Sequence, residues 1–340
     1  MANSAAHHPE PRPYGTLAVV GAGAWGTALA LVAAAQVKQV LLWAREAEVI
    51  ADVTKLRENR QFLPGVVLPR NIRPVSELDA LRNAEATLLV PPAQHIRAAA
   101  SRLKGIVARG SPVVLCAKGI ESRTGKLLIE VLAEELPGCV LAVLSGPSFA
   151  RDVARGLPTA VTVAAPDDAA PRLQASLSRP GFRPYATQDL TGVALGGAAK
   201  NVYAIACGIV EGASLGESAR AAVVSRGFAE LLRLGAALGA RPETLMGLSG
   251  LGDLVLTATS PTSRNYSLGL ALGRGAKLSE VLGAGYPLAE GASTAPALLE
   301  RARRHGVELP IAEATAAVLA ERLGVAEAAN ALLSRPLKSE

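Results

Sequence analysis

The chain has 340 residues, half of them hydrophobic and only 3% aromatic, so it is long enough for two domains with largely aliphatic cores. Its net charge of +6 suits anionic ligands, and its one short basic cluster, residues 301–305, favours a solvated helix face over a nucleic-acid patch. Cys116, Cys139 and Cys207 lie in apolar stretches without CxxC or metal-ligand spacing, which predicts buried, reduced thiols and no metal site.

The N-terminal residues 1–14 are polar and proline-rich and lack an apolar segment, which predicts a disordered tail rather than a secretory signal. The longest apolar run, residues 195–210, is interrupted by Lys200 and Asn201. We therefore expect no membrane span and a cytoplasmic protein.

Strand-like and helix-like segments alternate through the first half of the chain. The expected strands are residues 16–20, 40–43, 87–90, 113–116, 140–144, 160–164 and 182–185. This alternation is typical of an α/β fold with a Rossmann-type, doubly wound parallel sheet. Strand signals stop near residue 189, so we expect a sheet domain over residues 15–195 and an all-helical C-terminal domain over residues 196–340.

A glycine-rich motif, residues 21–26 (GAGAWG), joins the first strand to a helix-forming segment, residues 27–35. Gly21 allows a tight turn, Gly23 lets the backbone approach a pyrophosphate, and Gly26 lets the helix pack close to the sheet. The helix N-terminus also offers N–H groups to phosphates. This context predicts an NAD or NADP site, the alternative being a glycine-rich packing turn.

The second strand ends beside Arg45 and Glu46. An NAD site usually places an acid here to bind the ribose, whereas a guanidinium can pair with the 2′-phosphate of NADP. We therefore expect NADP to be favoured or at least accepted, unless Glu46 competes or Arg45 is only a surface side chain.

Five stretches of the chain carry a family resemblance. They are residues 21–28 (GAGAWGTA), 117–121 (AKGIE), 145–160 (SGPSFA…GLPTA), 199–212 (AKNVYAIACGIVEG) and 247–265 (GLSGLGDLVLTATSPTSRN). Together they resemble bacterial NAD(P)-dependent glycerol-3-phosphate dehydrogenase over nearly the whole chain. One departure is residues 287–295 (PLAEGASTA), where the family usually has VxEGxxTA, although Glu290 keeps its place.

The resemblance implies NAD(P)H-dependent reduction of dihydroxyacetone phosphate to sn-glycerol 3-phosphate, which supplies glycerophospholipid synthesis, by an enzyme that is usually a homodimer. The expected cofactor contacts are Gly21, Gly23, Ala24, Trp25, Gly26, Arg45, Lys118, Ala150, Arg264 and Glu290. The expected substrate contacts are Lys118, Gly146, Ser148, Lys200, Asp253, Ser263, Arg264 and Asn265. The expected catalytic residues are Lys200, Lys118 and Asp253.

Carbonyl reduction needs a proton donor, and Lys200 is the first candidate. It lies in an apolar helical run, residues 192–210, where burial would lower the pKa of a lysine. The alternative is a lysine whose head reaches water, and the family match favours catalysis. Lys118 follows a strand at the carboxyl end of the sheet, where doubly wound folds bind ligands, so we expect it to polarise the carbonyl unless it is a plain loop lysine.

Asp253 follows a glycine-rich turn, and we expect it to orient Lys200 or accept a substrate hydroxyl, or to cap a helix. The triplet 263–265 (SRN) stands at a helix start and is expected to hold the substrate phosphate, with Arg264 also touching the cofactor. Ser148 is placed between cofactor and substrate, unless it only caps a helix.

Two other functions remain open at this point. A related two-domain hydroxyacid dehydrogenase would share the plan but would not need the phosphate site at residues 263–265. A non-catalytic NAD(P)-sensing regulator would keep the glycine motif but would not need Lys118, Lys200 and Asp253 together.

Overall fold

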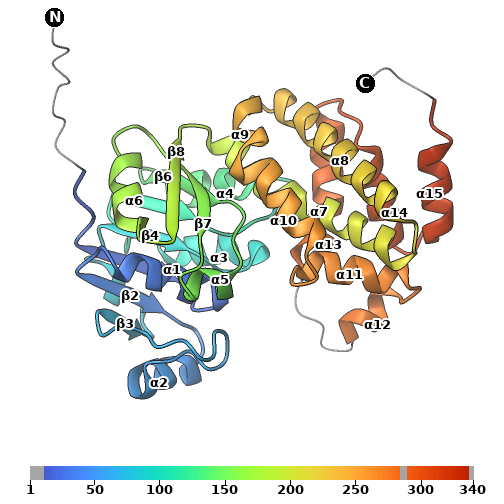
Figure 1. Ribbon diagram of the computed structural model, residues 1–340. Helices are drawn as coiled ribbons and strands as arrows, with labels where there is room; N and C mark the ends of the chain where they lie inside the picture. Colours follow the sequence, from blue (N-terminus) through green and yellow to red (C-terminus); the bar gives the residue numbers. More distant parts are fainter. Residues whose placement is uncertain (1–10, 284–288, 337–340) are drawn as a thin grey trace, which may run out of the picture.

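A computed structural model describes residues 11–283 and 289–336 of the chain. In Figure 1 a sheet with its covering helices forms one half of the molecule, and helices α7 to α15 form the other. The predicted plan of a Rossmann-type sheet domain followed by a helical domain is thereby confirmed.

Eight strands of the described chain form one sheet. They are β1 (Thr16–Val20), β2 (Gln39–Trp43), β3 (Ile72–Val75), β4 (Ala86–Leu89), β5 (Pro112–Leu115), β6 (Val140–Ser145), β7 (Thr159–Ala164) and β8 (Phe182–Thr187). Their order is β3-β2-β1-β4-β5-β6-β7-β8, and β1 to β6 are parallel. This is the order 3-2-1-4-5-6 of a Rossmann fold.

The sheet differs from the sequence prediction at two strands. β7 runs antiparallel to β6, because only the short helix α5 (Ala150–Ala154) joins them and a parallel crossover needs a longer connection. β3 was not predicted, because Pro74 within it argues against a strand. It is tolerated because β3 lies at the sheet edge, where a missing N–H costs no ladder hydrogen bond.

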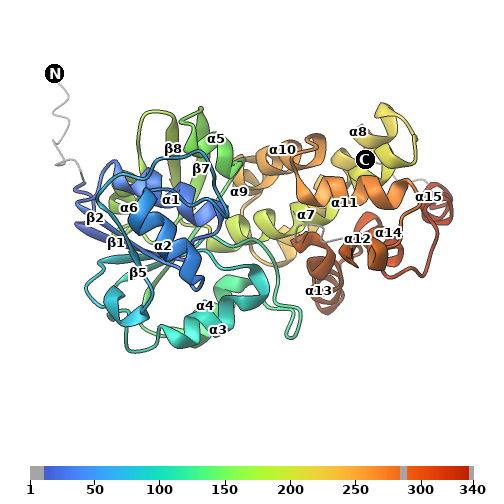
Figure 2. The ribbon, with the colours of Figure 1, turned by 90° about the horizontal axis from the view of Figure 1, so that it is seen from below.

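Helices cover both faces of the sheet, as Figure 2 shows from below. Apolar residues of α1 (Ala24–Ala34), α2 (Ala47–Leu56) and α6 (Ala170–Leu177) pack on one face. Those of α3 (Ile96–Arg102) and α4 (Leu128–Glu135) pack on the other. Two short 3-10 helices, η1 (Leu78–Leu81) and η2 (Ala93–His95), complete the connections, and His95 is exposed.

The described part of the chain after residue 189 is entirely helical. It contains α7 (Leu190–Gly212), α8 (Glu217–Ala237), α9 (Pro242–Met246), η3 (Leu248–Gly252), α10 (Asp253–Thr259), α11 (Arg264–Gly273), α12 (Leu278–Gly283), α13 (Glu290–Arg304), α14 (Pro310–Leu319) and α15 (Val325–Leu333). The side chain of Asp189 caps α7 by accepting the N–H of Gly192 at 2.7 Å. The predicted division between residues 195 and 196 falls inside α7 and stays a prediction.

Helix α7 is the central element of the helical domain. By length and hydropathy it could cross a membrane, but its whole apolar window is buried inside the protein, which is typical of a core helix. It packs backbone to backbone on α11, because Gly208 and Gly212 face Gly269 and Gly273. A Cβ on any of these four glycines would overlap a carbonyl oxygen of the other helix. The close approach fixes α7 and α11, which both carry predicted site residues.

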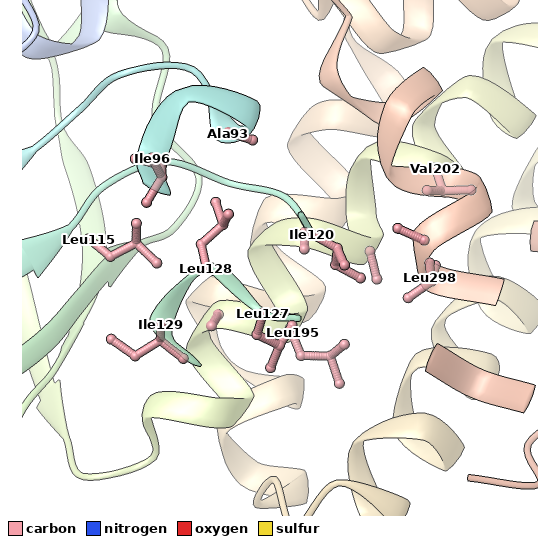
Figure 3. Close-up of a cluster of buried hydrophobic side chains, with 14 of the residues drawn as sticks. Ala93, Ile96, Leu115, Ile120, Leu127, Leu128, Ile129, Leu195, Val202 and Leu298 are labelled. Atoms are coloured by element: carbon pink, nitrogen blue, oxygen red, sulfur yellow. The ribbon is translucent and has the colours of Figure 1, made fainter. Parts of the chain in front are cut away.

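Both domains share one hydrophobic core. Figure 3 shows Ile96, Leu115 and Leu128 of the sheet domain beside Leu195 of α7 and Leu298 of α13. Because this cluster continues across the domain boundary, it packs the sheet domain and the helical domain against each other.

Three sequence predictions need comment. Tyr14 ends the predicted disordered tail, yet it is buried, its N–H bonds to Ser176 and its ring lies 3.9 Å from the guanidinium of Arg172. Cys116 and Cys207 are buried as predicted, but Cys139 is only half-buried. Residues 1–10 of the tail, and Pro287 and Leu288 of the departure from the family pattern, lie outside the described residues.

Candidate active site

The three glycines of the first motif have three different surroundings. Gly21 turns the chain with a φ of +111°, a conformation that favours glycine. A Cβ at Gly23 would point into open space, while one at Gly26 would overlap the carbonyl oxygen of Gly21. Gly21 and Gly26 therefore allow the strand and helix α1 to pack tightly, and Gly23 leaves room for a phosphate group. The turn at Gly21 and the close packing at Gly26 are as expected, and the pyrophosphate contact of Gly23 stays a prediction.

The neighbouring cofactor candidates also lie around this turn. Ala24 and Trp25 are the first residues of α1, and Ala150 is the first residue of α5, which packs against α1. The indole Nε1 of Trp25 is buried without a hydrogen-bond partner in the described structure. A buried donor without an acceptor is costly, so this side chain and the open space at Gly23 fit a ligand rich in acceptor oxygens, such as a dinucleotide.

Arg45 stands just beyond β2, as predicted. Its side chain is 77% exposed and is paired with the adjacent Glu46 at 2.9 Å. Exposed ion pairs of this kind are weak. A ligand phosphate could therefore replace Glu46 as the partner of the Arg45 guanidinium at a small cost in free energy.

Lys200 and Lys118 meet at one carboxylate, that of Asp253. The ammonium of Lys200 donates to Oδ1 at 2.5 Å, and the ammonium of Lys118 donates to Oδ2 at 2.6 Å. The Asp253 side chain is only 1% exposed, and that of Lys200 is 7% exposed. The structure thus brings together the three predicted catalytic residues, although Lys118 and Asp253 are 135 positions apart.

Burial lowers the pKa of Lys200 to about 8, and the positive charge of Lys118 acts in the same direction, while Asp253 opposes the shift. The Lys200 ammonium is therefore buried and does not extend into water, which was the alternative for this residue. An amine with a pKa near neutrality can both give and take a proton at physiological pH.

Asp253 is positioned by an unusual turn. It follows the π-helical segment η3, and π-helical turns are frequent at functional sites. This segment packs directly on α7, since a Cβ at Gly196 would touch the carbonyl oxygen of Ser249. Asp253 is the first residue of α10 but caps no backbone N–H, so the capping alternative does not describe it.

Two further polar residues belong to this site and were not proposed from the sequence. The hydroxyl of Thr257 accepts from Lys200 at 2.6 Å and donates to the Asp253 carbonyl at 2.6 Å. Asn201, next to Lys200, accepts from Asn265 at 2.9 Å. The spacing of Thr257 four residues after Asp253 on one helix would have been a usable signal.

The triplet at residues 263–265 has divided roles. Ser263 caps α11, because its hydroxyl accepts the N–H of Tyr266. The amide of Asn265 donates to Asn201 and accepts from the Gly291 N–H at 2.9 Å, which ties α11 to α7 and α13. Arg264 is exposed and makes no hydrogen bond within the described chain. It is the member of the triplet that is available to a ligand.

Glu290 at the start of α13 contacts the segment that follows the carboxyl end of strand β4. Its carboxylate accepts the N–H of Ala93, in the loop after β4, at 2.8 Å. Burial raises the pKa of Glu290, and this N–H and the charges of Arg264, Lys118 and Lys200 oppose the shift. Glu290 thus lies between the cofactor side and the cationic site.

Gly146 supports Lys118 from the end of β6. Its carbonyl accepts from the Lys118 ammonium and from the Ser148 hydroxyl, both at 3.1 Å. Its φ is +150°, and a Cβ at this position would lie 2.8 Å from the Cα of Val161, so a side chain would collide with β7. Ser148 caps no helix; its hydroxyl turns back into the loop. Within the described residues, no group of three or more potential metal ligands occurs.

Two family models match the chain. The NAD-dependent glycerol-3-phosphate dehydrogenase N-terminus matches residues 16–170, and the C-terminus of the same family matches residues 189–330. The chain belongs to this family. The resemblance in the five sequence stretches is thereby confirmed.

Full-length relatives and solved structures agree with this membership. The chain is 57% identical to a glycerol-3-phosphate dehydrogenase (NAD(P)+) of Parvibaculum lavamentivorans, covering 96% of this chain and 98% of that protein. It is 55% identical to the one of Caulobacter vibrioides, covering 95% and 98%. The structure of glycerol-3-phosphate dehydrogenase from Coxiella burnetii superposes with a TM-score of 0.89 at 37% identity, covering 96% of this chain and all of that one.

A more distant structure shows why the fold alone does not identify the substrate. D-mandelate dehydrogenase with NADH superposes with a TM-score of 0.62 at 14% identity, covering 94% of this chain and all of that one. That similarity concerns the fold only. The two-domain plan therefore serves hydroxyacid dehydrogenases too, and family membership separates this chain from that alternative.

Proposed function

We propose that this chain reduces dihydroxyacetone phosphate to sn-glycerol 3-phosphate with NADPH or NADH, and that Lys200 is its proton donor. The observation that carries the proposal is the buried carboxylate of Asp253 shared by two lysines. When both lysines are protonated the group carries one net positive charge, which suits an oxygen on which negative charge develops.

The reaction needs a hydride and a proton at the two ends of one carbonyl bond. A bound nicotinamide cofactor would supply the hydride for the carbonyl carbon. Lys200 gives its proton to the carbonyl oxygen and becomes a neutral amine, and in the reverse direction the neutral amine takes the hydroxyl proton. Asp253 and Thr257 fix the direction of the Lys200 ammonium. Lys118 polarises the carbonyl from the carboxyl end of the sheet.

The cofactor would lie along the glycine motif. Gly23 leaves room for the pyrophosphate, and the unpaired indole N–H of Trp25 is a donor to it. Arg45 would leave Glu46 for the 2′-phosphate of NADP, and Glu290 would contact the cofactor from the helical domain. NAD lacks that phosphate and would bind without the contribution of Arg45.

The substrate phosphate would bind Arg264, the exposed cation at the N-terminus of α11. A guanidinium matches a phosphate bidentately, and a helix N-terminus favours an anion. Ser263 and Asn265 shape this end of the helix through their own hydrogen bonds. Gly146 and Ser148 border the substrate from the sheet side.

We also propose a cellular setting, which family membership supports. The product is a building block for glycerophospholipid synthesis, the enzyme acts in the cytoplasm, and two copies assemble into a homodimer. The dinucleotide-binding part comprises residues 15–195, and the helical substrate part comprises residues 196–340.

The test follows NADPH and NADH oxidation separately with three substrates: dihydroxyacetone phosphate, unphosphorylated dihydroxyacetone and a 3-oxo acid. We expect turnover of the phosphorylated substrate to exceed that of the other two by at least about 100-fold, since a lost charged contact is worth roughly 1.5–3 kcal/mol and also mispositions the carbonyl. A preference for the 3-oxo acid would favour a hydroxyacid dehydrogenase. Binding of NADPH without turnover of any substrate would favour a regulator.

A further inference from the structure

A compact hairpin follows Lys118 directly. Residues 120–127 form it, with an antiparallel bridge between Ile120 and Leu127. The N–H of Glu121 bonds to the Lys126 carbonyl at 2.9 Å and closes the loop. Because Lys118 lies two residues before this 120–127 hairpin, any displacement of the hairpin moves the Lys118 backbone.

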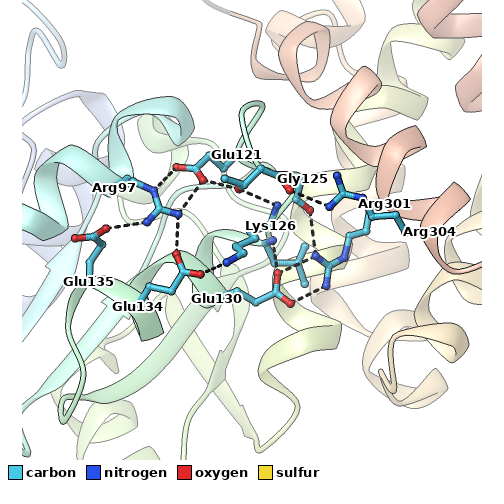
Figure 4. A network of polar contacts seen from close by, with 11 residues as sticks. Arg97, Glu121, Gly125, Lys126, Glu130, Glu134, Glu135, Arg301 and Arg304 are labelled. Atoms are coloured by element: carbon cyan, nitrogen blue, oxygen red, sulfur yellow. Dashed lines mark hydrogen bonds and ion pairs between the residues drawn. The ribbon is translucent and has the colours of Figure 1, made fainter.

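Ion pairs between side chains hold one side of the hairpin to the sheet domain (Figure 4). Arg97 of α3 donates to both oxygens of Glu121, at 2.8 and 2.9 Å. The same guanidinium reaches Glu134 and Glu135 of α4 at 2.8 Å each. Its hydrogen bonds to Glu121 lower the pKa of that carboxyl group. The base of the hairpin is therefore fixed to the sheet domain.

The helical domain holds the other side through α13. Arg301 donates to the Gly125 carbonyl at 3.1 Å and to both oxygens of Glu130 at 2.8 Å. Arg304 donates to the Thr124 carbonyl at 3.1 Å. Arg301 is only 12% exposed, so the prediction of a solvated helix face is wrong for this residue, whereas Arg303, Arg304 and His305 are exposed as predicted. Figure 4 shows these arginines reaching across from α13 to the sheet domain.

The start of α13 contacts the same region. Glu290 accepts the Ala93 N–H, and a Cβ at Gly119 would overlap Ala93 and lie in van der Waals contact with Thr294 of α13. Gln94 joins the two loops by donating to the Ile120 carbonyl at 2.9 Å. Helix α13 therefore carries Glu290, a proposed cofactor contact, at its start and contacts the 120–127 hairpin near its end.

We propose that Arg301 is a positioning residue for Lys118, acting through Glu130 and the 120–127 hairpin. The proposal rests on the catalytic role of Lys118 proposed above. Arg301 is suited to this role because its planar fork binds one carboxylate bidentately and still reaches the Gly125 carbonyl, which a lysine cannot do. Loss of Arg301 removes the α13 contacts to Gly125 and Glu130 and leaves, among the described residues, only the more exposed hydrogen bonds of Arg304 and Ser293 on the hairpin. The hairpin then shifts on α13, and Lys118 moves away from Oδ2 of Asp253.

The test compares Arg301→Gln with Arg303→Gln, a matched change on the same helix. Arg303 is 66% exposed, and its one ion-pair partner among the described residues is Glu300. We expect Arg301→Gln to lower kcat/KM for dihydroxyacetone phosphate by about 10-fold or more, because displacements of about 1 Å cost rates of up to 100-fold. Arg303→Gln should stay within about twofold of the wild type, and Arg301→Lys should recover part of the loss.

A pH profile separates positioning from general stability. Lys200 is faced by Asp253, Lys118 and Glu290, and the nearby Lys118 charge lowers its pKa. When Lys118 moves away, the pKa of Lys200 rises, so the alkaline limb of kcat in Arg301→Gln should move to higher pH. Glu130→Gln should have the same effects, and the double variant should add little to either single one.

The proposal is overturned if Arg301→Gln lowers the melting temperature while kcat, KM and the pH profile of the folded enzyme stay those of the wild type. Additive losses in the double variant with Glu130→Gln would also overturn it. Failure of the proposed function looks different, because the wild type itself would then not reduce dihydroxyacetone phosphate.

Discussion

Asp253 accepts a hydrogen bond from each of the two lysines, so replacing its charge is an informative perturbation. Asp253→Asn keeps the size of the side chain and removes the carboxylate that both ammonium groups contact at 2.5 and 2.6 Å. Asp253 raises the pKa of Lys200 against the effect of burial. Without the carboxylate, the pKa of Lys200 falls further below about 8.

The size of the shift follows from the lost interaction. A hydrogen bond to a charged group contributes roughly 1.5–3 kcal/mol, and one pKa unit corresponds to about 1.4 kcal/mol. The pKa of Lys200 should therefore fall by about one to two units. At pH 8, where half of the wild-type Lys200 is protonated, the variant would retain roughly 1–10% of the protonated form, and reduction would be about 5- to 50-fold slower.

The assay is the pH dependence of kcat for reduction of dihydroxyacetone phosphate. With Lys200 as the proposed proton donor, reduction requires its protonated form, so the wild-type rate should fall as the pH rises through about 8. In Asp253→Asn this limb should move to lower pH, which is opposite to the shift expected for Arg301→Gln. An alkaline limb that stays in place in Asp253→Asn would refute the coupling of Asp253 to Lys200.

Three further changes test other parts of the account. Arg45→Ala should weaken binding of NADPH more than binding of NADH, by about 10- to 150-fold; equal losses in titrations of the two cofactors would show that Arg45 does not bind the 2′-phosphate. Arg264→Ala should lower kcat/KM for dihydroxyacetone phosphate by about 10- to 100-fold but add little to the poor turnover of unphosphorylated dihydroxyacetone. After correction for any change in NADPH affinity, equal losses on both substrates would exclude Arg264 as the phosphate anchor. Gly269→Ala should lower the free energy of unfolding by about 1–3 kcal/mol in urea titrations, because its Cβ would overlap the Ile205 carbonyl of α7; an unchanged midpoint would contradict the packing of α7 on α11.

The sheet was largely predictable because its strands are short apolar runs between turn-forming residues. The exceptions have physical reasons. Strand β3 was not predicted because it contains Pro74, and a proline is tolerated there only because the strand lies at the sheet edge. The antiparallel direction of β7 depends on the short connection through helix α5, which does not allow a parallel crossover. The apolar composition of a strand carries no information on its direction.

The site was predictable as a set of residues but not as an arrangement. The apolar helix left open whether Lys200 is buried or reaches water, and the family resemblance favoured the buried residue. Its contact with Asp253 and Thr257 depends on how α10 packs against α7. Arg301 was misassigned for the same reason. Its partner Glu130 lies 171 positions away, so no local pattern distinguishes it from its exposed neighbour Arg303.

The central claim is that Lys200 is the proton donor, and the most direct measurement compares Lys200→Ala with Lys55→Ala, a change of an exposed lysine at the end of α2. Turnover of dihydroxyacetone phosphate and binding of NADPH are measured for both variants. Lys200→Ala should bind NADPH as the wild type does and lose about 10²- to 10⁴-fold in kcat, the usual contribution of a general acid, while Lys55→Ala should be unchanged. A Lys200→Ala enzyme with near-normal kcat would contradict the account and make Lys118 the leading candidate for the proton donor.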